Sequence, residues 1–186
     1  MMPRIGAPKA RKSAWRHWNF CVGKYILFIF SAMAQANQLT QEYKEFVELL
    51  NANKVEYLVV GAYAVARYGY VRATGDIDVW VNPTKENAQR VVTTLQLFGL
   101  GGLGYTIDDF STPDTIVQLG VAPLRIDLLT SVDGVDFESC YAQRETKILD
   151  EVPINFISLA DLCQNKASTG RLKDQLDLQN LNNVNK

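Results

Sequence analysis

Three aspartates lie in apolar segments that otherwise have the pattern of buried β-strands. Asp76 and Asp78 are two residues apart in YVRATGDIDVWV (70–81), and Asp127 lies in LRIDLL (124–129). Because residues i and i+2 of a strand project to the same face, Asp76 and Asp78 are expected to lie side by side. Two carboxylates that close repel each other unless a cation lies between them. The pattern therefore indicates a site where acids surround a cation.

Magnesium suits these ligands, since it is often held by one or two carboxylates plus substrate phosphates. Three acids on neighbouring strands can hold two such ions about 4 Å apart, which activate an attacking oxygen and stabilise a leaving phosphate. We therefore predict that Asp76, Asp78 and Asp127 bind two Mg2+ ions. The alternative is structural: the acids cap strand ends or pair with Arg72 and Arg125.

A strand-to-helix turn lies just upstream of the paired acids. Val60, Gly61 and Ala62 end an apolar segment and open a helix. Glycine there lets a phosphate approach the backbone, and a helix N-terminus supplies free N–H donors. Arg72 and Thr74 lie close enough to touch the same site, with Arg72 contacting phosphate oxygens or remaining a solvated loop arginine. These residues predict the nucleotide-binding side of the site.

The segment KASTGRLKD (166–174) forms a basic elbow between two predicted helices. One interpretation is that the elbow closes over a triphosphate. The other is that Lys173 and Asp174 are surface charges. The sequence leaves both open.

A glycine-rich segment resembles a nucleotide-binding motif but lies in the wrong context. Gly99, Gly101 and Gly104 match GxGxxG, which binds dinucleotides only where it follows a strand and opens a helix. Here the glycines follow a predicted helix and lead into a turn-rich segment. A Rossmann-type site is therefore not expected.

Hydrophobic periodicity and turn residues predict the elements that position these side chains. The helices are expected at 39–50, 62–68, 84–98, 137–144, 158–169 and 171–181, with the proline at 83 helping to open the third. The extended segments are expected at 56–60, 76–81, 115–119, 124–129 and 147–157, the last with a turn near residue 150. The segment 98–114 reads as a loop with some local structure.

Composition limits the chemistry further. The only histidine, His17, lies in a basic N-terminal segment, so the folded part has no imidazole for a nucleophile or a metal. The cysteines Cys21, Cys140 and Cys163 form no CxxC pair, which argues against a disulfide framework and a structural zinc site. Beyond the basic segment acidic residues predominate, which argues against a broad nucleic-acid-binding face.

Residues 1–36 form an N-terminal extension with basic residues and no acid. Its apolar run, YILFIFSAMA, followed by small residues, has the pattern of a secretory signal. The interpretation that we prefer is a true start at Met33, because the domain at 37–186 has no disulfides and would act on intracellular substrates. We therefore expect a cytoplasmic protein. A transmembrane helix is not expected, because the run falls short of roughly 20 residues.

Three blocks resemble the nucleotidyltransferase (DNA polymerase beta-like) superfamily. The blocks are LVVGAYAVARYGYVRATGDIDVWV, IVQLGVAPLRIDLLTSVDGVDF and ISLADLCQNKASTGRLKDQLDL, and the likeness covers residues 39–181. More narrowly, they look like the small bacterial nucleotidyltransferases related to the toxins of type IV toxin-antitoxin pairs. The resemblance implies that Asp76 and Asp78 bind both metals, and that Asp127 is the third ligand and helps to activate the acceptor hydroxyl.

The resemblance also implies roles on the nucleotide side. Gly61 and Ala62 correspond to a glycine-serine or glycine-glycine pair that cradles the triphosphate, and alanine at the second position lacks a hydroxyl for phosphate. Lys166 corresponds to a functionally important lysine of the toxin relatives.

These observations lead to one expectation about fold and function. The fold is expected to be α+β, with a short mixed β-sheet, helices packed mainly on one face and a helical C-terminus. The activity is expected to be magnesium-dependent transfer of a nucleoside monophosphate from an NTP to a hydroxyl of a small molecule, an RNA 3′ end or a protein. A regulator or antitoxin is a possible partner, and no membrane is involved. The alternative is a binding or regulatory module of the same fold that has lost turnover.

Overall fold

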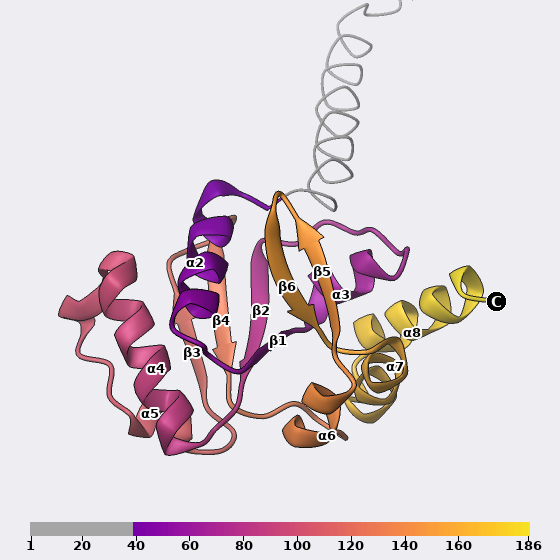
Figure 1. The fold of residues 1–186 in the computed structure, drawn as a ribbon. Coiled ribbons are helices and arrows are strands. Elements are labelled where there is room, and N and C mark those ends of the chain that lie inside the picture. The colour runs from indigo at the N-terminus through magenta and orange to yellow at the C-terminus, as the bar shows by residue number, and fades with distance from the viewer. Residues whose placement is uncertain (1–38) are drawn as a thin grey trace, which may run out of the picture. The chain divides into compact units, whose positions relative to one another are not determined.

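The computed structural model describes residues 39–186 (Figure 1), so the predicted extension, residues 1–36, lies outside the described residues. The described part contains one six-stranded sheet. Its strands are β1 (Tyr57–Val59), β2 (Asp76–Val81), β3 (Ile116–Leu119), β4 (Arg125–Leu129), β5 (Glu145–Leu149) and β6 (Val152–Phe156).

The helices begin where the sequence offers capping side chains. Thr40, Thr84, Asp136 and Ser158 each accept a backbone N–H at the start of a helix. Pro83 precedes the helical residues, so the expectation that proline takes the first helical position is corrected: Thr84 is the N-cap. The helices are α2 (Gln41–Ala52), α3 (Gly61–Arg67), α4 (Lys85–Leu95), α5 (Asp108–Ser111), α6 (Phe137–Ala142), α7 (Leu159–Ser168) and α8 (Leu172–Val184).

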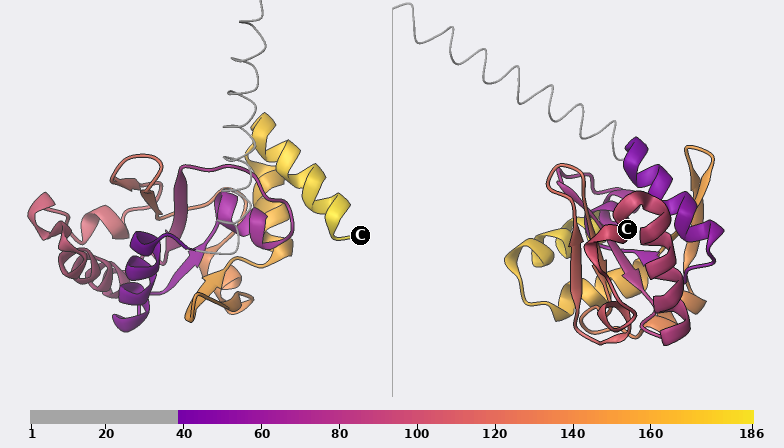
Figure 2. Two further views of the ribbon diagram at one scale, coloured as in Figure 1. Left: turned by 90° about the horizontal axis from the view of Figure 1, so that it is seen from above. Right: turned by 90° about the vertical axis from the view of Figure 1, so that its left-hand side faces the viewer.

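The sheet is mixed, with the order β3-β4-β2-β1-β6-β5. Strand β2 pairs in parallel with β4, and β1 pairs in parallel with β6, whereas the other neighbours are antiparallel. The extended segments expected at 115–119 and 124–129 pair as the β3–β4 hairpin, and the segment expected at 147–157 with a turn near residue 150 forms most of the β5–β6 hairpin. Helices α4 and α5 lie toward the β3 end of the sheet, and α7 and α8 lie toward the other side (Figures 1 and 2).

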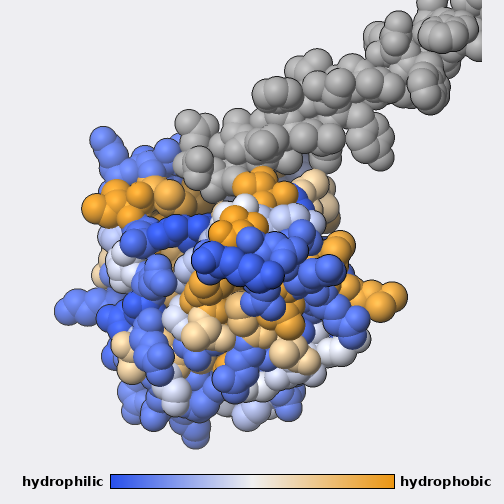
Figure 3. Space-filling model, turned by 90° about the vertical axis from the view of Figure 1, so that its right-hand side faces the viewer, coloured by the Kyte–Doolittle hydropathy of each residue, from blue (hydrophilic) through white to orange (hydrophobic). Residues whose placement is uncertain are grey.

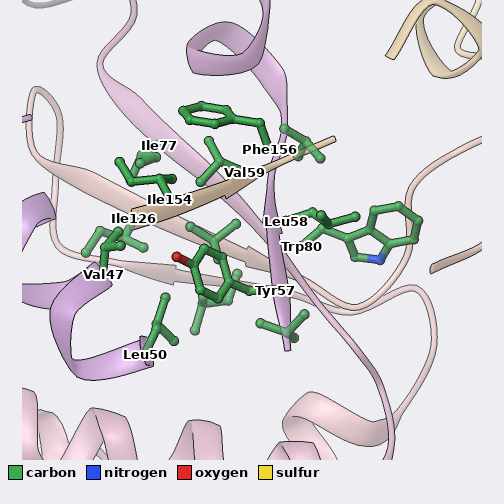
Figure 4. Close-up of a cluster of buried hydrophobic side chains, with 14 of the residues drawn as sticks. Val47, Leu50, Tyr57, Leu58, Val59, Ile77, Trp80, Ile126, Ile154 and Phe156 are labelled. Atoms are coloured by element: carbon green, nitrogen blue, oxygen red, sulfur yellow. The ribbon is translucent and has the colours of Figure 1, made fainter. Parts of the chain in front are cut away.

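The core forms between α2 and the sheet (Figure 4). Val47 and Leu50 of α2 are buried together with apolar side chains of the strands, among them Tyr57, Ile77 and Ile126. Along β2 the buried residues alternate with the two aspartates at its start. One face of β2 therefore packs into the core, while the other presents carboxylates.

The first half of helix α8 has an inverted pattern, because two acids lie on its inner side and two leucines on its outer side. Asp174 and Asp177 are buried, whereas Leu172 is 83% exposed and Leu176 is also exposed. Figure 3 shows the face of the molecule on this side, where hydrophobic patches interrupt a mostly hydrophilic surface. The first half of α8 is therefore held by charges, whereas Leu181, further along the helix, is buried in the apolar core.

The glycine-rich segment after α4 follows a helix, as predicted, and continues as π-helical and 3-10 turns over Gln96–Leu100 and Gly101–Leu103. Among the described helices, none combines the length and the apolar character that a membrane span needs. The predicted mixed sheet and helical C-terminus are confirmed.

Candidate active site

The three predicted acids meet on one face of the sheet because β2 and β4 are parallel neighbours. Asp78 lies directly opposite Asp127 in the register, and Asp76 lies opposite Arg125. A cleft of about 510 Å3 opens above this face. Its lining includes every residue predicted for the site: Gly61, Ala62, Arg72, Thr74, Asp76, Asp78, Asp127 and Lys166.

The strand-to-helix turn approaches the acids so closely that only glycine fits. Gly61 has a φ of +60°, and a Cβ atom at this position would lie 1.8 Å from Oδ2 of Asp78. We predicted that glycine here leaves room for a phosphate. The structure adds a second reason, because the absent side chain leaves room for the carboxylate itself.

The carboxylate of Asp78 lies in surroundings that disfavour its ionised form. Within residues 39–186 its carboxylate has no hydrogen-bonding partner. Burial, followed by the charges of Asp76 and Asp127, raises its pKa to about 6, although Lys166 and Arg72 counteract part of this rise. A nearby positive charge would therefore favour the ionised form of Asp78.

Arg125 compensates the other two acids. Its Nε atom donates to Oδ1 of Asp127 at 2.7 Å, and its Nη2 atom donates both to Oδ2 of Asp127 at 2.9 Å and to Oδ2 of Asp76. The hydrogen bond to Asp127 is the main cause that raises the pKa of Arg125. The structural alternative was that the acids pair with Arg72 and Arg125. It is present in part, because Arg125 pairs with Asp76 and Asp127, whereas Arg72 pairs with Asp177.

The side chain of Arg72 is oriented by a buried acid of α8. Arg72 donates from Nε and Nη2 to the two oxygens of Asp177 at 2.9 and 3.0 Å. Its remaining nitrogen, Nη1, is buried and has no partner among the described residues. Arg72 therefore lines the cleft as an oriented cation with one nitrogen that has no partner there.

Lys166 belongs to the same buried network. Its Nζ atom lies 2.5 Å from Oδ1 of Asp174 and 3.4 Å from Oδ2 of Asp177. Thr169 and Arg171 complete the hydrogen bonds of Asp174. The interpretation of Asp174 as a surface charge is therefore wrong, because its carboxylate is buried against Lys166. Lys173 lines the cleft without an ion pair among the described residues.

The remaining predicted residues have smaller roles in the geometry. Thr74 donates its hydroxyl to Oδ1 of Asp76 at 2.6 Å, so its contact is with the acid. Ala62 is buried next to Gly61 and lines the cleft, with no hydroxyl to offer a phosphate.

The donor set fits magnesium in its chemistry, because it consists of carboxylate oxygens on adjacent strands. Within residues 39–186, however, these acids are not arranged closely enough around one point to hold a metal ion. The guanidinium of Arg125 lies between two of them, because it donates hydrogen bonds to both Asp76 and Asp127.

Two residues of the site were not predicted as functional from the sequence. Arg125 was considered only as a structural partner, although its spacing of two from Asp127 places it on the same face of β4. Asp177 was not identified at all. Its spacing of three from Asp174 on a helix is the signal that links them.

The fold is shared with a solved nucleotidyltransferase structure. The lincosamide antibiotic adenylyltransferase LnuA, bound to lincomycin, superposes with a TM-score of 0.50 over 80% of this chain and 99% of that chain, at 18% sequence identity. A nucleotidyltransferase-like antigenic protein from Paracoccidioides brasiliensis gives a TM-score of 0.45 at 16% identity, covering 74% and 71% of the two chains. The first comparison shows that the chain has a nucleotidyltransferase fold.

The sequence then identifies the family. The model of the family described as nucleotidyl transferase of unknown function (DUF2204) matches residues 39–186, and the chain belongs to this family. No match was found among the curated proteins. The predicted membership of the nucleotidyltransferase superfamily is confirmed.

Proposed function

We propose that this protein catalyses magnesium-dependent transfer of a nucleoside monophosphate from an NTP to an acceptor hydroxyl. The observation that supports the proposal is the charge arrangement in the cleft. Asp76, Asp78 and Asp127 line one side, while the cations Arg72 and Lys166 are held against buried acids next to them. Carboxylates that suit magnesium thus lie beside groups that suit phosphate.

Each group has a role in this proposal. Asp76, Asp78 and Asp127 would hold magnesium, which supplies positive charge to the reacting phosphate and to the leaving group. Arg72 and Lys166, which both line the cleft, would supply the positive charge for the phosphates.

The reaction conserves atoms and charge without a further reactant. The acceptor oxygen forms a bond to the α-phosphorus, and the bond between that phosphorus and the bridging oxygen of pyrophosphate breaks. A carboxylate oxygen of Asp127 accepts the proton of the acceptor hydroxyl. Both oxygens of Asp127 accept hydrogen bonds from Arg125, and losing one of these bonds would make the carboxylate a stronger base.

A small-molecule acceptor is the choice that the cleft supports best. Its volume of about 510 Å3 lies within the range of small-molecule sites. The LnuA structure contains the antibiotic lincomycin, which is a small molecule. RNA 3′ ends and protein hydroxyls are the other acceptor classes, and a cytoplasmic toxin-antitoxin pair with a regulator is the biological setting that the sequence resemblance supports.

The test measures pyrophosphate release from each of the four NTPs with magnesium, in the presence of lincomycin, a short RNA, or the protein alone. We expect release with at least one NTP and acceptor class, and its loss in Asp76→Ala. Full magnesium-dependent activity in Asp76→Ala would contradict the assignment of the acids.

A second candidate function is a nucleotide-binding or regulatory module without turnover. Ala62 favours it, because the hydroxyl that would contact phosphate is missing. The enzyme and the module can be separated by combining the pyrophosphate-release assay with thermal-shift measurements of the protein with each NTP, with and without magnesium. Stabilisation without pyrophosphate release would support the module, and release would support the enzyme.

A further inference from the structure

Arg125 occupies the space between two of the three acids. It lies two residues before Asp127 on β4 and directly opposite Asp76 on β2. Because all three side chains project to the same face of two paired strands, its guanidinium reaches both carboxylates. The arrangement is set by the strand register and does not depend on a loop.

The carboxylate oxygens of Asp76 and Asp127 already accept hydrogen bonds from neighbouring side chains. Both oxygens of Asp127 accept from Arg125, and Gln118 adds a bond to Oδ2 at 3.3 Å. Asp76 accepts from Thr74 at Oδ1 and from Arg125 at Oδ2. All four oxygens of these two carboxylates therefore have donors, and the guanidinium of Arg125 occupies the position between the two acids that a shared cation would take.

Arg125 cannot make room for a cation by losing its proton, because a guanidinium stays charged in proteins. A divalent cation placed between the same oxygens would repel it. The side chain can move away, since it is 30% exposed. The backbone of Arg125 stays in place, because the carbonyl accepts a hydrogen bond from the Tyr43 hydroxyl at 3.1 Å and β4 is paired on both sides.

We propose that Arg125 competes with the divalent cation for Asp76 and Asp127, and that its withdrawal is the step that opens the site to the metal. This inference rests on the proposed function, because it takes the three acids as the cation site. Arg125 is accordingly a positioning residue: it holds the acids together on the sheet and lowers their affinity for the cation.

The experiment uses Mn2+ as the probe and measures its binding by electron paramagnetic resonance, without nucleotide and without an activity readout. Arg125→Gln should bind Mn2+ roughly three- to tenfold more tightly than the wild-type protein. Arg67→Gln is the matched control, because Arg67 is 31% exposed and pairs with Glu145 outside the cleft. This control should bind Mn2+ as the wild type does.

Arg125→Lys covers the case in which Arg125→Gln does not fold. Lysine keeps the charge but loses the planar pair of donors, so Mn2+ binding should again be tighter than in the wild type, by a smaller factor. Unchanged or weaker Mn2+ binding in the folded Arg125 variants would overturn the proposal.

Asp76→Ala separates this proposal from the proposed function. If Mn2+ binds the wild type, is lost in Asp76→Ala and is not tightened in the Arg125 variants, competition is wrong while the metal site stands. If no variant binds Mn2+ at millimolar concentration, both the competition and the metal-dependent activity are wrong.

Discussion

Gly61 and Asp78 are in such close contact that a methyl group on residue 61 would overlap the carboxylate of residue 78. The turn before α3 and the acid on β2 therefore constrain each other. The proposed phosphate side and the proposed metal side of the cleft are therefore in direct contact.

Gly61→Ala should consequently lower the free energy of unfolding by roughly 2–5 kcal/mol, through backbone strain and displacement of Asp78. Urea denaturation measures the change. Gly104→Ala is the matched control, because Gly104 also has a positive φ but has open space around it. It should cost only about 1–2 kcal/mol. Equal losses in the two variants would show that the contact with Asp78 is unimportant.

Asp76→Ala should abolish nucleotidyl transfer and preserve the fold, since Asp76 lies at the start of β2 beside the cleft and outside the apolar core. Pyrophosphate release and circular dichroism measure the two properties. Asp133→Ala changes another exposed acid of the cleft and should retain activity. Activity lost equally in both variants would argue against a special role for Asp76.

The raised pKa of Asp78 predicts a dependence of stability on pH. The folded protein holds a proton on Asp78 up to about pH 6, whereas in the unfolded chain the pKa is near the ordinary 3.8. The contribution of Asp78 to stability is therefore full below pH 3.8 and is lost as pH rises through about 6.

Asp78→Asn removes this titration. Its stability relative to the wild type should rise between pH 4 and pH 7 by up to about 3 kcal/mol, measured by urea denaturation at each pH. A constant difference across this range would mean that the pKa of Asp78 is not raised.

Asp177→Asn should weaken NTP binding and stability together. Asp177 is 1% exposed and contacts both Arg72 and Lys166, so its neutralisation leaves two cations partly uncompensated. We expect a loss of roughly 3–5 kcal/mol in unfolding free energy, and weaker NTP binding by calorimetry. Glu145→Gln, which breaks a longer and more exposed pair with Arg67, should cost less than about 1 kcal/mol.

The acids could be predicted from the sequence because each lies in a strand with strong alternation. Ile77 and Val79 identify the buried face of β2, so the opposite face had to carry Asp76 and Asp78. The third acid followed from the same reasoning on β4. The parallel pairing of β2 with β4 then gave the expected proximity.

The buried ion network could not be predicted in the same way. Helix α8 turns Asp174 and Asp177 inward and Leu172 outward, the reverse of the usual amphipathic pattern. Periodicity identifies a helix but cannot show that its inner face is held by charge, because the partners Lys166 and Arg72 come from α7 and from the loop before β2. The contact of Arg125 with Asp76, 49 residues earlier, was hidden for a similar reason.

The pairing of β4 with β2 has a consequence for how the chain folds. The β3–β4 hairpin is local, whereas the contact between the two acid-bearing strands spans tens of residues, so the carboxylates come together only when this distant pairing forms. Arg125 and Asp127 lie on the same strand, so β4 brings a positive charge next to Asp76 when it pairs with β2. The sheet therefore folds with less repulsion among its three carboxylates than it would without the arginine.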